Sequence, residues 1–148
     1  IKKAVSNIDD VAQFNIPYNS VFASSASLDI DGFRGFKGSS IEVNVVTIDK
    51  FLVDTNSNPD LIKIDVEGFE DRVLEGMRGL LDRHHPAIIL ECLSDGPAKE
   101  ITDILTDYSY RFYHLTDIGL VENNKITPDV EDNFKNWVCV NNKNPVVT

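Results

Sequence analysis

The pattern of apolar and polar positions divides the chain into two parts, with the change at Leu61. Before it, Val11–Ile16 alternates apolar and polar residues, and Ile41–Ile48 is β-branched and mostly alternating, as in half-buried strands. We predict that these two runs pair as a small antiparallel unit, and that Ile1–Val5 is the end of another strand. Between the two runs, Tyr18–Ser40 is rich in Ser and Gly without a lasting period, which predicts a long loop.

After Leu61, short apolar runs alternate with stretches whose apolar residues recur at helical spacing. The predicted strands are Leu61–Val66, Ala87–Leu90, Tyr110–Leu115 and Trp137–Val140. The predicted helices follow the first two strands, one carrying Phe69, Val73, Leu74, Met77, Leu80 and Leu81, the other beginning at Pro97. This alternation predicts a parallel sheet with crossover helices. The last strand follows a predicted turn region, Thr116–Thr127, instead of a helix, and is therefore predicted to run antiparallel.

The predicted elements form one domain, residues 1–148, with two sections. Residues 8–48 are predicted to be a β-hairpin and loop insertion, and residues 60–141 the α/β half of the domain. A short helix, Lys50–Val53, is predicted between them, with Asp49 as its cap, because Asp is favoured at the position that precedes a helix.

Composition and charge limit the classes of function. The 148 residues are 42% hydrophobic and 26% charged, as in ordinary globular domains. The net charge of −10 argues against a nucleic-acid partner, which requires clustered Lys and Arg. No apolar run approaches the roughly 20 residues of a membrane span, so no membrane contact is expected. The two cysteines, Cys92 and Cys139, lie in apolar surroundings and are predicted to be buried free thiols, which makes a reducing cytoplasmic location the expectation.

Carboxylates follow the C-terminal ends of two successive predicted strands. Asp65 and Glu67 end the run that begins at Leu61, and Glu91 follows Ala87–Leu90. Open α/β sheets bind ligands at the carboxyl ends of their strands, so these acids are candidates for chemistry. A purely structural explanation is open too, since Glu67 suits a helix start and Asp65 a helix cap.

The same three acids could ligate Mg²⁺ or Ca²⁺, which prefer oxygen ligands. A metal site requires the side chains to meet at one point, and we do not expect Asp65, Glu67 and Glu91 to converge. The prediction is therefore a site without a metal.

A specific motif surrounds the first two acids and continues through the next strand. It reads Leu61-Ile-Lys-Ile-Asp-Val-Glu-Gly-Phe-Glu70, then Val73-Leu74 and Pro86-Ala-Ile-Ile-Leu-Glu91. This motif resembles the C-terminal half of the FkbM-type methyltransferases, and Val45-Val-Thr-Ile-Asp-Lys-Phe-Leu52 resembles the family's stretch before it. The resemblance implies S-adenosylmethionine as cofactor and a three-layer, Rossmann-like class I methyltransferase sheet of strand order 3-2-1-4-5-7-6. The strands from Leu61 on would be the fourth to the seventh, with the seventh antiparallel.

The resemblance also implies that part of the enzyme is missing from this sequence. Family members carry a first strand ending in a glycine-rich loop that holds the cofactor, and a second strand whose final acid binds the ribose. Neither is found here, so we expect a fragment whose sheet is incomplete at its N-terminal half. Ala4-Val5-Ser6 resembles the segment after the family's third strand, which makes Ala4 and Ser6 candidate cofactor contacts. The exposed sheet edge at Leu61–Val66 could then pair with a second copy of the chain.

By the resemblance, Asp65 and Glu67 are the catalytic candidates, because they would face the methyl group and the acceptor. Asp65 would orient or deprotonate an acceptor hydroxyl. The predicted substrate-binding residues are Glu91, Gly68 and Lys63.

The predicted activity is S-adenosylmethionine-dependent methyl transfer, with O-methylation of a hydroxyl on a sugar or natural-product-like small molecule. Two other classes stay open. The chain could be a non-catalytic fragment or binding module of the same fold that does not bind the cofactor. It could also be a carboxylate-pair hydrolase such as a glycosidase, which would require Asp65 and Glu91 to act together.

Overall fold

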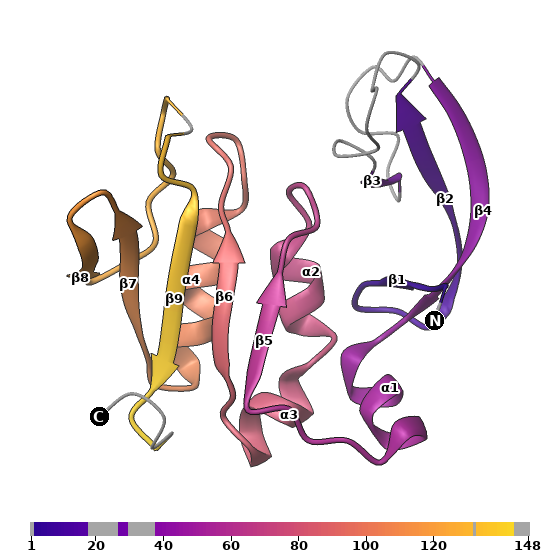
Figure 1. Cartoon of the computed structure of the whole chain (residues 1–148). Coiled ribbons are helices and arrows are strands. Elements are labelled where there is room, and N and C mark those ends of the chain that lie inside the picture. Colours follow the sequence, from indigo (N-terminus) through magenta and orange to yellow (C-terminus); the bar gives the residue numbers. More distant parts are fainter. Residues whose placement is uncertain (1, 18–26, 30–37, 132, 144–148) are drawn as a thin grey trace.

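The computed structural model describes residues 2–17, 27–29, 38–131 and 133–143. Within these residues the strands form two sheets, of order β1-β4-β2-β3 and β5-β6-β9-β7-β8, accompanied by four helices (Figure 1). The first sheet contains β1 (Ala4–Val5), β2 (Asp10–Pro17), β3 (Ser27–Asp29) and β4 (Gly38–Val46). The second contains β5 (Leu61–Ile64), β6 (Ala87–Glu91), β7 (Tyr110–Thr116), β8 (Gly119–Asn123) and β9 (Asn136–Asn141). The helices are α1 (Ile48–Thr55), α2 (Glu70–Glu75), α3 (Arg78–Arg83) and α4 (Ala98–Asp107), and none of them is long and apolar enough to cross a membrane.

The first sheet is built on the antiparallel pairing of β2 with β4. The ladder runs from Asp10 opposite Val45 to Pro17 opposite Gly38, which confirms the predicted antiparallel unit. β1 adds in parallel to β4 and confirms the predicted strand end at the start of the chain. The prediction of one loop over Tyr18–Ser40 is wrong at two places, because β3 pairs with β2 and because Gly38–Ser40 belongs to β4. Residues 18–26 and 30–37 of the predicted loop lie outside the described residues.

The second sheet has the strand order that the family resemblance implies for its C-terminal half. β5 and β6 are parallel, and β9 lies between β6 and β7 and runs antiparallel to both. The predicted order of the fourth to seventh strands, with an antiparallel seventh, is therefore confirmed. The layers of a complete Rossmann-like domain stay a prediction.

β8 is a strand that the sequence analysis missed. Thr116 pairs with Gly119, so β7 and β8 are joined by a two-residue turn, and β8 occupies part of the region Thr116–Thr127 that was predicted to be turn alone. Gly119 has φ of 107°, a value that residues with a Cβ rarely adopt. The turn therefore depends on a backbone conformation that glycine supplies, rather than on an apolar pattern.

The core lies between one face of the second sheet and the helices that follow its strands. In Figure 1, α2 and α4 lie behind the strands. Side chains alternate between the two faces along a strand, so residues two positions apart point to the same side, as do their partners on the neighbouring strands. One row contains Ile62, Ile88, Cys139 and Phe112, and the other contains Ile64, Leu90 and Trp137. All of these residues belong to the core or pack against it, together with Val73, Leu74, Leu80, Leu81, Ile101 and Leu105 of the helices.

Trp137 is the largest side chain of this core. Its side chain is fully buried and stacks on His114, with ring centroids 4.3 Å apart and an angle of 6° between the ring planes. The imidazole of His114 is fixed in turn by a 2.6 Å hydrogen bond between its Nε2 and the carbonyl oxygen of Phe134. Cys92 and Cys139 are buried free thiols, as predicted.

The single helix predicted after β5 is two helices in the structure. It is interrupted at Gly76 and Met77, between α2 and α3. A Cβ atom at Gly76 would lie 2.2 Å from the carbonyl oxygen of Ser6, so the segment after β1 approaches the helix backbone where no side chain intervenes. The carbonyl oxygen of Gly76 accepts a 3.0 Å hydrogen bond from the N–H of Asp49. Contacts from distant parts of the chain thus coincide with the break in the helical pattern.

Asp49 caps a helix other than the predicted one. Thr47 is the N-cap of α1, and its hydroxyl oxygen accepts a 3.2 Å hydrogen bond from the N–H of Lys50. The carboxylate of Asp49 instead accepts 2.8 Å hydrogen bonds from the N–H groups of Gly79 and Leu80, in the first turn of α3. The prediction of Asp49 as the cap of Lys50–Val53 is therefore wrong, because the break at Gly76 creates free N–H groups within its reach.

Replacement of this carboxylate tests its contribution to stability. Asp49→Ala should lower the free energy of unfolding by about 1–2 kcal/mol, since loss of a helix cap typically costs that much and two N–H groups lose their acceptor. Urea unfolding followed by circular dichroism measures the change. Asp54→Ala, at an exposed position of α1, the helix that also contains Asp49, is the control. An equal loss in both variants would show that Asp49 does not stabilise α3.

Candidate functional site

β5 and β6 bring their C-terminal ends to the same edge of the second sheet. The two strands are parallel and Ile64 pairs with Leu90, so Asp65 lies level with Glu91. The prediction that these acids follow neighbouring parallel strands is confirmed. This is the edge at which open α/β sheets bind their ligands.

A tight turn connects β5 to α2 and carries two of the acids. β5 ends at Ile64, two residues before the predicted end at Val66. Glu67 and Gly68 have φ of 57° and 94°, so both are in the left-handed region. Such a conformation costs a residue with a Cβ about 1 kcal/mol, and at Gly68 it is nearly free. The turn therefore redirects the chain immediately after Asp65.

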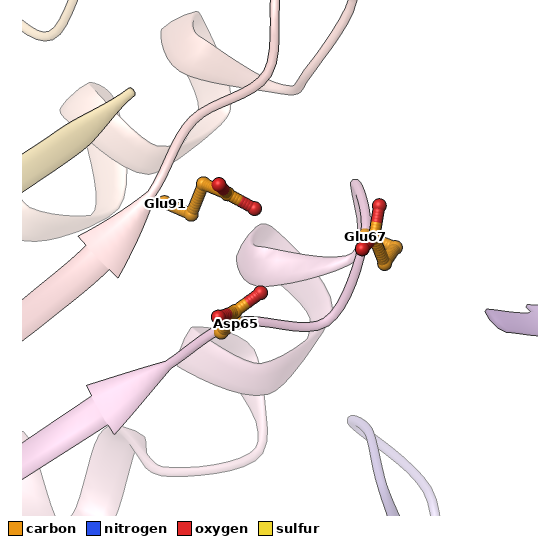
Figure 2. Close-up of side chains that lie close together, drawn as sticks. All are labelled: Asp65, Glu67 and Glu91. Carbon is orange, nitrogen blue, oxygen red and sulfur yellow. The ribbon is translucent and has the colours of Figure 1, made fainter. Parts of the chain in front are cut away.

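The three acids converge. One carboxylate oxygen each from Asp65, Glu67 and Glu91 lies within 4.8 Å of the other two. Figure 2 shows Asp65 and Glu67 on the loop after β5 and Glu91 at the end of β6, with their carboxylates around a common space. The expectation that they would not converge is wrong, because it did not foresee the left-handed turn at Glu67. We call these three residues the acid cluster.

Two lysines offset part of the negative charge of the acid cluster. Lys63 forms an ion pair with Asp65, and the Nζ of Lys135 lies 3.9 Å from Oε1 of Glu91. Lys63, predicted to bind substrate, is thus held at the cluster by Asp65. Burial raises the pKa of Glu91, and the charges of Asp65 and Glu67 and a hydrogen bond with Asp65 raise it further, while Lys135 opposes them. Glu91 therefore retains its proton more readily than a fully solvated glutamate would.

The arrangement can accept hydrogen bonds and a proton from a ligand hydroxyl. Carboxylate oxygens at this spacing could also ligate a divalent cation, but a group of acids is not by itself evidence of a bound ion. The part of the chain that the structure describes shows no glycine-rich turn after a strand of the kind that holds a nucleotide cofactor; the turn after β5 contains Gly68 alone.

The remaining predicted site residues divide between two places. Gly68 lies in the turn between Glu67 and Glu70. Ala4 and Ser6 lie in and just after β1, in the other sheet, and are not part of the acid cluster. Ser6 has no exposed surface, and its hydroxyl donates a 3.3 Å hydrogen bond to Oδ1 of Asn7.

Glu70 is a residue of this region that the sequence analysis did not assign to the site. Acids are favoured at a helix start, and Glu70 is the first residue of α2, but its side chain has no exposed surface. Its Oε1 accepts hydrogen bonds from backbone N–H groups of the turn after β5. The only signal in the sequence is its spacing after Gly68, and that spacing does not reveal burial.

Comparison with known proteins identifies the class. The family described as methyltransferase FkbM domain matches residues 3–112, which is most of the chain and includes the whole acid cluster. The chain therefore belongs to the FkbM methyltransferase family, as the motif around Asp65 predicted. Family membership indicates methyltransferase activity, and methyltransferases of this type generally use S-adenosylmethionine. No curated protein and no solved structure gave a significant match.

The raised pKa of Glu91 predicts how a neutral substitute changes stability with pH. Below the ordinary carboxyl pKa of 4.5, Glu91 is protonated in both folded and unfolded states, so wild type and Glu91→Gln should respond alike to pH. As pH rises through the raised pKa, the wild type loses stability because the folded state resists ionisation. Glu91→Gln should therefore become progressively more stable relative to the wild type, measured by urea unfolding between about pH 4 and pH 8.

The control for this measurement is Glu42→Gln, an exposed acid of β4 in the other sheet. Its stability difference from the wild type should change little over the same pH range. A Glu91→Gln difference that shrinks as pH rises would contradict the raised pKa of Glu91.

Proposed function

We propose that the chain forms the acceptor side of an S-adenosylmethionine-dependent O-methyltransferase acting on a hydroxyl of a sugar or natural-product-like molecule. The observation that carries the proposal is the acid cluster at the carboxyl ends of β5 and β6, in a member of a methyltransferase family. A cluster of hydrogen-bond acceptors suits a ligand that presents several hydroxyl donors close together.

Methyl transfer to oxygen requires the hydroxyl to be oriented and to lose its proton. The cofactor supplies the methyl group when bound. Asp65 accepts a hydrogen bond from the reacting hydroxyl and takes its proton. Glu67 and Glu91 accept hydrogen bonds from neighbouring hydroxyls and so orient the acceptor, because charged acceptors make the stronger hydrogen bonds.

The charge of the acid cluster also limits the acceptor. Lys63 pairs with Asp65 and Lys135 with Glu91, but an anionic group placed beside the three carboxylates would be repelled by them. A neutral, hydroxyl-rich acceptor should therefore be favoured over its phosphorylated or uronic-acid counterpart.

The test is methyl transfer by the longest polypeptide that contains this chain. S-adenosylhomocysteine release and methylated product are measured with a panel of neutral glycosides and their anionic counterparts. Asp65→Asn should lower kcat/KM by about 10²–10⁴-fold, the usual contribution of a general base. Glu42→Gln, outside the acid cluster, should leave kcat/KM unchanged.

Other outcomes would assign the chain to another class. Absence of saturable S-adenosylmethionine binding in calorimetry, together with absence of turnover, would support the non-catalytic binding module. Release of sugar from a glycoside without the cofactor would support a hydrolase and contradict the methyl-transfer proposal.

A further inference from the structure

The turn between β5 and α2 is fixed by a carboxylate outside the acid cluster. Glu70 is the first residue of α2, and its side chain is fully buried. Its Oε1 accepts hydrogen bonds from the N–H of Val66, at 3.3 Å, and from the N–H of Gly68, at 3.2 Å. These two N–H groups belong to the residues on either side of Glu67. One oxygen atom thus holds the backbone on both sides of a cluster residue.

The turn that Glu70 holds includes a residue, Glu67, in an intrinsically unfavourable backbone conformation. Glu67 has a left-handed backbone conformation, which is unfavourable for any residue with a Cβ. Loss of the Glu70 oxygen would leave the N–H groups of Val66 and Gly68, in this partly buried turn, without the acceptor that now stabilises it; a fully buried N–H group without an acceptor costs about 1–3 kcal/mol. The conformation of Glu67 therefore depends on the side chain three residues later.

The burial of Glu70 is itself unfavourable. Removal from water raises the pKa of Glu70, while the N–H groups of its own residue, Gly68 and Val66 act in the opposite direction. Its second oxygen, Oε2, is buried without a hydrogen-bond partner in the described part of the chain. A buried carboxylate with one unpaired oxygen weakens the fold. What the buried carboxylate of Glu70 provides in return is a fixed geometry of the turn, through its hydrogen bonds with Val66 and Gly68.

We propose that Glu70 is a positioning residue for the acceptor site. By accepting from Val66 and Gly68 it holds Glu67, and through the same turn Asp65, at the spacing that lets both meet Glu91. The effect on catalysis rests on the proposed function, whereas the effect on the spacing of the acid cluster does not.

Two substitutions separate the acceptor atom from the rest of the side chain. Glu70→Gln keeps an oxygen of equal reach, so both N–H bonds and the acid cluster should persist. Glu70→Ala removes the acceptor, and the oxygens of Asp65, Glu67 and Glu91 should then separate beyond 4.8 Å, the limit within which they now lie. Crystal structures of the two variants measure this directly. Asp71→Asn, at the next residue of α2, is the control and should leave the cluster unchanged.

If Glu70→Ala does not fold, Glu70→Asp replaces it. Asp retains the charge but is shorter by one methylene group, so its oxygen no longer reaches both N–H groups. The acid cluster should again open, which distinguishes the position of the acceptor from its charge.

Kinetics give a readout that a loss of stability alone would not change. Per folded molecule, Glu70→Ala or Glu70→Asp should raise the acceptor KM and lower kcat/KM by about 10²-fold, since small misplacements of reacting groups have effects of this size. The KM for S-adenosylmethionine should stay constant, and Glu70→Gln should restore kcat/KM to within a few fold. Partial unfolding alone would lower apparent kcat with both KM values unchanged.

The crystal structures and the kinetics together distinguish failure of this inference from failure of the proposed function. If the wild type transfers no methyl group to any acceptor, the proposed function fails, and the crystal structures still decide the role of Glu70. An intact acid cluster in Glu70→Ala or Glu70→Asp would overturn the inference. Equal activity losses in the Gln and Ala variants would also overturn it, because the oxygen acceptor would then not be the group that matters.

Discussion

The parallel pairing of β5 with β6 is the constraint on which the rest of the site depends. Ile64 lies opposite Leu90, and this register places the ends of both strands together. Both side chains are buried in the core, so a shift by one residue would turn them to the other face of the sheet. The apolar contacts that oppose such a shift also bring Asp65 level with Glu91. The position of the acids is therefore set by the packing of residues that carry no chemistry.

A second constraint is the contact of the segment after β1 and of α1 with the helices that follow β5. Ser6 and Asp49 both reach the point where the helical pattern after β5 is interrupted, Ser6 through its carbonyl oxygen and Asp49 through its carboxylate. The backbone approach at Gly76 leaves no room for a side chain. Ser6 and α1 thus contact backbone groups of α2 and α3, on the same connection that begins with the acid cluster and Glu70.

Much of the fold could be predicted from the sequence, because its signals are local. The β-branched run that begins at Ile41 forms a strand up to Val46, the apolar run at Ala87–Leu90 forms another, and the order β5-β6-β9-β7 followed from the family resemblance. The features that were missed depend on contacts between distant residues. Asp49 caps a helix that begins about 30 residues later, and the break before this helix coincides with the close approach of Ser6 to Gly76.

The candidate site shows the same division between local and distant effects. Asp65, Glu67 and Glu91 could be selected from the sequence because each follows a recognisable strand. Their convergence could not, since it depends on a left-handed Glu67 and on a buried Glu70, and neither property has a local pattern. The β8 hairpin was missed for a related reason, because Gly119 enables a turn without any apolar repeat.

The stacked pair of Trp137 and His114 has a practical consequence. Trp137 is the single tryptophan of the sequence, and it lies on β9, between the strand that carries Glu91 and the strand that carries His114. Its intrinsic fluorescence therefore arises from one known position at the centre of the second sheet. Because the indole has no exposed surface, any opening of this sheet brings it into contact with water and shifts its emission. The molecule thus contains its own optical probe of the sheet that supports the acid cluster, and no label is needed to follow it.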